Sequence, residues 1–119
     1  MKTVLTLAAL AVALGTAATA SELKGPQIVS ALSGKSFACE DNKKEDKMAL
    51  EFPTLDPATK EVPYNFTYNG KKSSGAYVIK SNGKAASKKS GQSRRFKVPA
   101  DGYVQIIGRS GQYWLCKAQ

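Results

Sequence analysis

The chain has 119 residues, with 18 Lys and Arg against nine Asp and Glu, a net charge of +9 and no histidine. Without histidine, Ser-His-Asp and Cys-His catalysis, His metal sites and the usual general base near neutral pH are excluded. We therefore predict a protein that is not an enzyme and uses no metal or cofactor, and we expect its charge to attract anions.

The first 20 residues have the features of a secretory signal peptide. Lys2 gives a short basic start, residues 4–14 are apolar, and Ala18-Thr19-Ala20 is a small-x-small cleavage site. The apolar run is too short to be read as a membrane span. We predict that residues 1–20 are removed and that residues 21–119 form one periplasmic or secreted domain.

A short helix and two strands are predicted next. Ile28, Val29 and Leu32 fall on one helical face, Pro26 suits the first turn and Gly34 suits the position after the end, so we expect a two-turn helix covering a sheet. Residues 35–40 and 48–52 alternate apolar and other side chains, as strands do. In the first of these strands, Phe37 and Cys39 share one face.

Residues 62–69 have the clearest alternation in the chain. Val62, Tyr64, Phe66 and Tyr68 share one face, which we predict to be the core face, and Pro63 suggests an edge or a strand end. Asn69-Gly70 is a strong hairpin signal, and residues 74–80 form the predicted return strand.

Residues 81–95 contain almost no apolar side chains. A weak strand at residues 84–87 is one interpretation, but a mobile basic loop is simpler; residues 95–98 form a further short strand. Arg94 and Arg95 could together hold a phosphate or carboxylate bidentately. The candidate binding residues are Lys84, Lys88, Lys89, Arg94, Arg95 and Lys97.

Residues 102–117 form the closing hairpin, with Ser110-Gly111 as its turn. Pairing Arg109 with Gln112 places Ile107 opposite Trp114 and Gln105 opposite Cys116. Cys116 has only Cys39 as an intrachain partner, so we predict a disulfide between the last strand and the first. Closing so long a loop stabilises the fold by roughly 4 kcal/mol in the chain-entropy model.

Seven or eight short antiparallel strands in one small domain predict an all-β fold, either a small barrel or a tight sandwich. The barrel is favoured, because a first-to-last disulfide and a capping helix both suit closure. Bulky inward side chains favour a filled interior; a small apolar ligand carried inside the barrel is the second hypothesis.

Two resemblances add to this interpretation. Leu32-Ser33-Gly34-Lys35-Ser36, Ser74-Gly75-Ala76-Tyr77 and Gly111-Gln112-Tyr113 resemble motifs of exported bacterial lipocalin-like (calycin-like) β-barrel proteins, although Phe37 stands where lipocalins have Trp. That resemblance implies a fold more than a function. Cys39, Ser74-Gly75-Ala76-Tyr77 and Cys116 are also similar in layout to periplasmic inhibitors of c-type lysozyme. The Tyr comes one position early for that motif, and a basic lysozyme would repel this chain.

The charge is unevenly distributed along the chain. Residues 21–61 have six Lys and eight acidic residues, whereas residues 62–119 have eleven Lys or Arg and only Asp101 as an acid. We predict a monomeric binding protein whose second half binds an anionic envelope polymer, lipid head groups or an acidic protein; a lysozyme or protease inhibitor is a further alternative. Nucleic acid is not expected, because no aromatic residues interleave with the basic ones. A solvated basic surface without a ligand is the alternative to any binding role.

Overall fold

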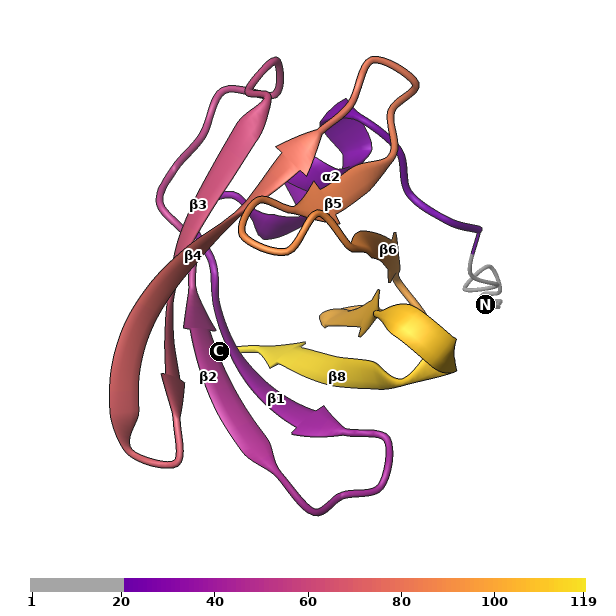
Figure 1. Cartoon of the computed structure of the whole chain (residues 1–119). Helices are drawn as coiled ribbons and strands as arrows, with labels where there is room; N and C mark the ends of the chain where they lie inside the picture. Colours follow the sequence, from indigo (N-terminus) through magenta and orange to yellow (C-terminus); the bar gives the residue numbers. More distant parts are fainter. Residues whose placement is uncertain (1–20) are drawn as a thin grey trace, which may run out of the picture.

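A computed structural model describes residues 21–119, and the predicted signal peptide lies outside these residues (Figure 1). One short helix, α2 (Pro26–Leu32), precedes the strands, and a 3₁₀ helix, η2 (Arg109–Gly111), joins the last two. Within residues 21–119, no helix is long and apolar enough to cross a membrane. The strands are β1 (Ser36–Asp41), β2 (Lys47–Glu51), β3 (Glu61–Tyr68), β4 (Lys71–Ile79), β5 (Ala85–Ser87), β6 (Ser93–Lys97), β7 (Tyr103–Ile107) and β8 (Tyr113–Ala118).

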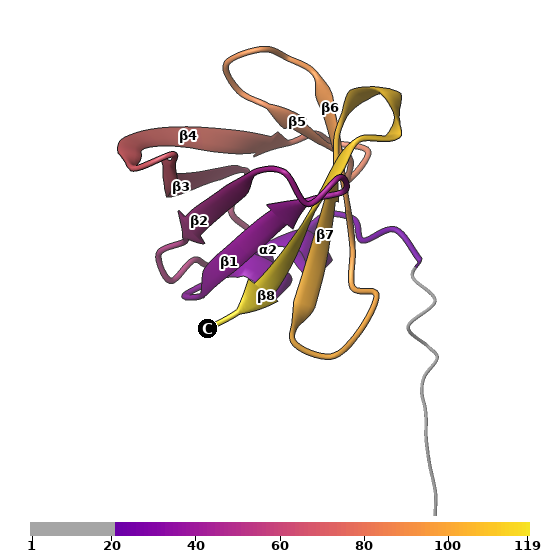
Figure 2. The same ribbon diagram turned by 90° about the horizontal axis from the view of Figure 1, so that it is seen from below.

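The eight strands form a closed antiparallel barrel, which confirms the predicted fold. Each strand pairs with the next in the chain, and β8 returns to pair with β1 (Figure 2). The order of strands around the wall is therefore the order in the sequence. The turns that join β1 to β2, β3 to β4, β5 to β6 and β7 to β8 lie at the end of the barrel away from α2, which we call the open end.

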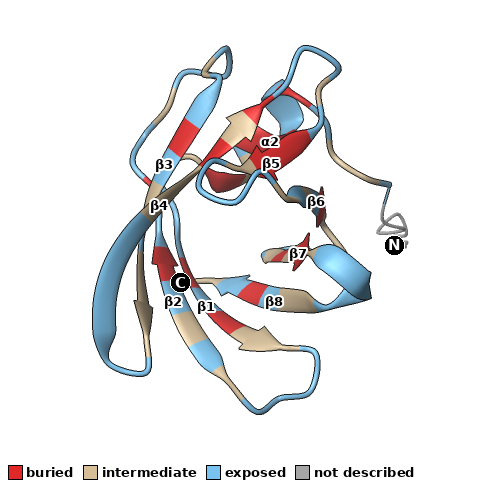
Figure 3. Cartoon of the chain, viewed as in Figure 1, coloured by how far each residue is buried: buried red, intermediate tan, exposed pale blue. Residues whose placement is uncertain are grey.

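The predicted helix is confirmed, and it covers the other end of the barrel. Ile28, Val29 and Leu32 are at most 1% exposed and pack against the strands, where buried positions gather (Figure 3). Gly34 follows the helix with a φ of 69°, a conformation that favours glycine. The helix is also anchored to the wall, because the Gly25 N–H donates to the Gly83 carbonyl at 2.8 Å.

The expectation of a filled interior holds near α2 and fails at the open end. Four aromatic residues that face inward there are only half-buried: Tyr64, Phe66, Tyr68 and Trp114. The reason lies in the neighbouring wall. β5 has three residues and pairs only with the last three of β4, so residues 71–75 of β4 have no strand on that side.

The disulfide between Cys39 and Cys116 is confirmed. The two residues are direct cross-strand partners of β1 and β8, with Cα atoms 4.0 Å apart and a sequence separation of 77. Both are buried in the core. The bond ties the last strand to the first at the seam that closes the barrel, and it agrees with an oxidising, extracytoplasmic location.

The predicted register of the closing hairpin is wrong by one residue. In the structure Ile106 pairs with Trp114 and Val104 with Cys116. The connection holds three residues rather than two, because the Gly108 N–H donates to the Gln112 carbonyl at 2.7 Å across η2. A one-residue slip exchanges the two faces of a strand, so Ile106 faces the core and Ile107 does not.

The basic segment is also more ordered than the simpler prediction of a mobile loop. Ala85 and Ala86 belong to β5 and are each 3% exposed, between β4 and β6. Two adjacent alanines followed by a serine give no alternation of apolar and polar side chains, so the sequence pattern does not mark this strand. The weaker interpretation, a strand near residues 84–87, was therefore the better one.

Candidate functional site

The six predicted binding residues do not form one site. Lys84 lies in the turn before β5 at the α2 end, while Lys88 and Lys89 follow β5 toward the open end. The other three, Arg94, Arg95 and Lys97, belong to β6. The wall of the barrel thus separates residues that are close in sequence.

Arg94 and Arg95 point to opposite faces of β6, so they cannot grip one anion side by side as predicted. Arg94 shares the inward face with Phe96, which is fully buried. Its guanidinium lies beside Gly108 and borders the interior near Ile106 and Trp114. Arg95 is exposed on the outside, with Nη1 3.6 Å from Glu22 Oε1.

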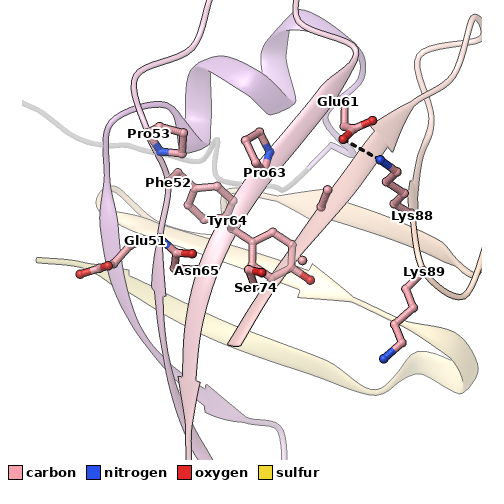
Figure 4. Close-up of a pocket in the computed structure, with 12 residues that line it drawn as sticks. Glu51, Phe52, Pro53, Glu61, Pro63, Tyr64, Asn65, Ser74, Lys88 and Lys89 are labelled. Carbon is pink, nitrogen blue, oxygen red and sulfur yellow. Dashed lines mark hydrogen bonds and ion pairs between the residues drawn. The ribbon is translucent and has the colours of Figure 1, made fainter. Parts of the chain in front are cut away.

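A groove of about 830 Å³ lies on the β3–β4 side of the barrel (Figure 4). Phe52 and Tyr64 provide aromatic surface, Asn65 and Ser74 provide polar groups, and Lys88 and Lys89 border one side. The groove also contains Glu51 and Glu61, so its two cations are balanced. Lys88 Nζ lies 2.9 Å from Glu61 Oε2, and because both side chains are more than half exposed this pair adds little stability.

Tyr64 is positioned by a glycine that the sequence analysis did not single out. Tyr64 and Gly75 are cross-strand partners, and a Cβ at Gly75 would lie 2.6 Å from Tyr64 Oη, so only glycine leaves room for the ring. The ring stacks on Tyr77 at 4.7 Å between centroids. Ser74-Gly75-Ala76-Tyr77 lies within β4, where a return strand was predicted, and Tyr77 is buried.

The two tyrosines share a hydrogen bond inside the barrel. Burial raises the pKa of the Tyr77 phenol well above its usual range, and the neighbouring Tyr64 raises it further. Burial also raises the pKa of Tyr64, while its hydrogen bond with Tyr77 opposes that shift. The positive charge of Arg94 lowers both pKa values, so the guanidinium acts on both rings.

A second hollow, of about 420 Å³, lies at the open end. Arg94, Ile106 and Trp114 line its interior side, and the β1–β2 turn adds Asp41, Glu45 and Asp46 at the rim. Lys43 and Arg109 also border this hollow, so its rim carries both signs of charge. The charge of Asp46 raises the pKa of the nearby Tyr68. Tyr68 packs edge-on against Trp114 at 6.3 Å between centroids.

The outside of β6, β7 and β8 carries a different set of side chains, which we call the β6–β8 face. Register places Lys97 beside Gln105 and Tyr103 beside Lys117, between core positions such as Val104. Leu115, the exposed large hydrophobic residue of the described chain at 37%, lies on the same face. The sequence alone does not reveal this face, because its residues come from three strands and only the pairing of these strands brings them together. The face consists of Arg95, Lys97, Tyr103, Gln105, Leu115 and Lys117.

Within residues 21–119, no three His, Cys, Asp or Glu side chains gather closely enough to hold a metal ion. At the rim of the hollow, Asp41 Oδ1 accepts a hydrogen bond from the Glu45 N–H at 2.8 Å. No protein-family model matches the chain, and neither a curated protein nor a solved structure is significantly similar to it.

Proposed function

We propose that the protein is an exported, non-catalytic binding protein of the lipocalin-like type that attaches to an anionic polymer of the cell envelope through the β6–β8 face. The observation that carries the proposal is the set of outward cations on three neighbouring strands. Alternation along β6 and β8 turns Arg95, Lys97 and Lys117 to the outside, and β7 lies between these two strands in the wall. The electrostatic field of such a face attracts and orients a polyanion.

The β6–β8 face also offers apolar contact between its charges. Arg95, Lys97 and Lys117 are spaced by Tyr103 and Leu115, which are partly exposed. Arginine and lysine bind carboxylate, sulfate or phosphate groups, and aromatic rings pack against sugar rings or methylene groups. An acidic polysaccharide presents both kinds of group in a repeating order, which suits a flat sheet surface better than a closed cavity.

The groove at Lys88 and Lys89 is the weaker candidate for this role. Glu51 and Glu61 balance its cations, and Lys88 is already paired with Glu61. Around β6–β8, the nearby acids are Glu22, which meets Arg95, Glu40, which pairs in register with Leu115, and Asp101 in the turn between β6 and β7.

The test is the affinity for heparin, as a soluble acidic polysaccharide, over a series of salt concentrations. A variant with Arg95, Lys97 and Lys117 all changed to Gln should bind about tenfold more weakly, because each screened contact contributes roughly 0.5 kcal/mol. Its affinity should also depend less on salt. The matched control changes Lys35, Lys43 and Lys47 to Gln, which removes the same charge from exposed positions on the β1–β2 side. Equal losses in both variants would mean that only net charge matters and would refute the face assignment.

A further inference from the structure

Arg94 is a cation turned into the barrel, and its side chain has few partners there. Within residues 21–119 the ion pairs are Lys88 with Glu61 and Arg95 with Glu22, so Arg94 has no carboxylate. Its hydrogen bond to the protein runs from Nη1 to the Ser93 carbonyl at 3.0 Å. Since a guanidinium carries five N–H donors, most of them remain free for a ligand or water.

The surroundings of Arg94 form a site with distinct parts. On one side are Tyr64 and Tyr77, whose rings stack on each other. The positive charge of Arg94 lowers the pKa of both phenols. On the other side the 420 Å³ hollow continues past Ile106 to Trp114. A half-buried cation and apolar surface thus meet in the hollow.

We propose that Arg94 binds the carboxylate of a small ligand with a single negative charge and an apolar body, which enters at the open end. The planar fork of arginine fits a carboxylate with two parallel hydrogen bonds. The apolar body of the ligand lies against Trp114 and Ile106, and contact with these side chains removes apolar surface from water.

The size of the hollow limits this ligand. Asp41, Glu45 and Asp46 border the hollow together with the cations Lys43 and Arg109, so neither sign of charge dominates the entrance. A hollow of about 420 Å³ admits one small molecule and not a polymer chain, and the single guanidinium of Arg94 suits one carboxylate. The ligand of the interior is therefore different from the polymer of the β6–β8 face, and this inference does not depend on the proposed function.

The chain contains its own reporter for the site, because Trp114 is its single tryptophan and lines the same hollow as Arg94. The experiment titrates the mature protein with octanoate and follows Trp114 emission. Octylammonium, which has the same chain length and the opposite charge, and inorganic phosphate, which has no apolar body, are the comparison probes. We expect a saturable change with octanoate and none with the other two.

Two neighbouring substitutions separate the interior site from the outer face. Arg94→Gln should weaken octanoate binding by about tenfold or more, the size of one lost charge-assisted contact, and should leave heparin binding unchanged. Arg95→Gln should leave octanoate binding unchanged and weaken heparin binding by about twofold, since one screened contact contributes roughly 0.5 kcal/mol. If Arg94→Gln does not fold, Arg94→Lys is the second variant, because it keeps the positive charge and loses the planar fork. Its octanoate affinity should be lower than that of the unmodified protein but higher than that of a variant without the charge. Equal binding of octanoate and octylammonium to the unmodified protein, or unchanged octanoate affinity in the Arg94 variants, would overturn the proposal.

Discussion

The contact between Tyr64 and Gly75 allows a sharp prediction about the β3–β4 hairpin. A Cβ added at Gly75 would lie 2.6 Å from Tyr64 Oη and 2.7 Å from Cζ. The ring would have to move by about 0.8 Å to reach an ordinary contact distance. It has little freedom to do so, because it stacks on Tyr77 at 4.7 Å and packs against Phe52 and Phe66 at 5.7 and 5.8 Å between centroids.

We therefore expect Gly75→Ala to lower the free energy of unfolding by about 2 kcal/mol, within the usual range for overpacking. In a domain of this size, that loss lowers the melting temperature by about 10 °C. The same substitution in a Tyr64→Val background should instead stabilise the strand by about 0.5 kcal/mol, because Ala is a better strand residue than Gly once the ring is gone.

The assay is urea unfolding of the four proteins of this double-mutant cycle, followed by circular dichroism. The sign of the Gly75→Ala effect should change between the two backgrounds, with a coupling energy of about 2.5 kcal/mol. A Gly75→Ala variant that is as stable as the parent, or equal losses in both backgrounds, would show that the ring does not depend on the glycine.

Two further predictions concern stability and one concerns the interior cation. Replacing both Cys39 and Cys116 by Ala should cost about 2 to 4 kcal/mol in urea unfolding, since the bond closes a long loop; a smaller loss than 1 kcal/mol would contradict the role of the seam. Tyr77 has a raised pKa in the folded state, so its stabilising effect is complete below pH 10, the unfolded value, and is lost as the pH rises toward the folded value. Tyr77→Phe should therefore flatten the fall in stability above pH 10, and an unchanged pH profile would contradict this. In the absence of ligand, Arg94→Met should have a free energy of unfolding equal to that of the unmodified protein or up to about 1 kcal/mol higher, because it replaces an interior cation that has no carboxylate by apolar contacts. A clear loss of stability would indicate a structural role for Arg94.

Much of the fold could be predicted because strong local patterns agreed with it. The alternation of residues 62–69, the Asn69-Gly70 turn and the helix that starts at Pro26 each lie where expected. The disulfide could be predicted because only one pairing exists in the chain. The strand, the turn and the helix are determined by residues close in sequence, and the disulfide has only one possible pairing. Tertiary contacts therefore do not change these predictions.

The errors occur where a single residue or a distant neighbour decides the outcome. Ser110-Gly111 reads as a two-residue turn, but both residues have positive φ inside a three-residue connection, and this shifts the register of β8. β5 forms because β4 and β6 enclose Ala85 and Ala86, which no local pattern reveals. The same pairing turns Arg94 inward and Arg95 outward. The basic segment therefore looks like one site in the sequence, whereas the barrel wall separates its inward from its outward cations.

The most direct test of the account is a map of where an acidic polysaccharide touches the folded barrel. Amide chemical shifts of isotope-labelled mature protein would be followed during a heparin titration. The account predicts that the shifts concentrate on β6, β7 and β8, at Arg95, Lys97 and Lys117, and spare β1 and β2. Shifts spread evenly over all exposed lysines, or centred on the groove at Lys88 and Lys89, would contradict it.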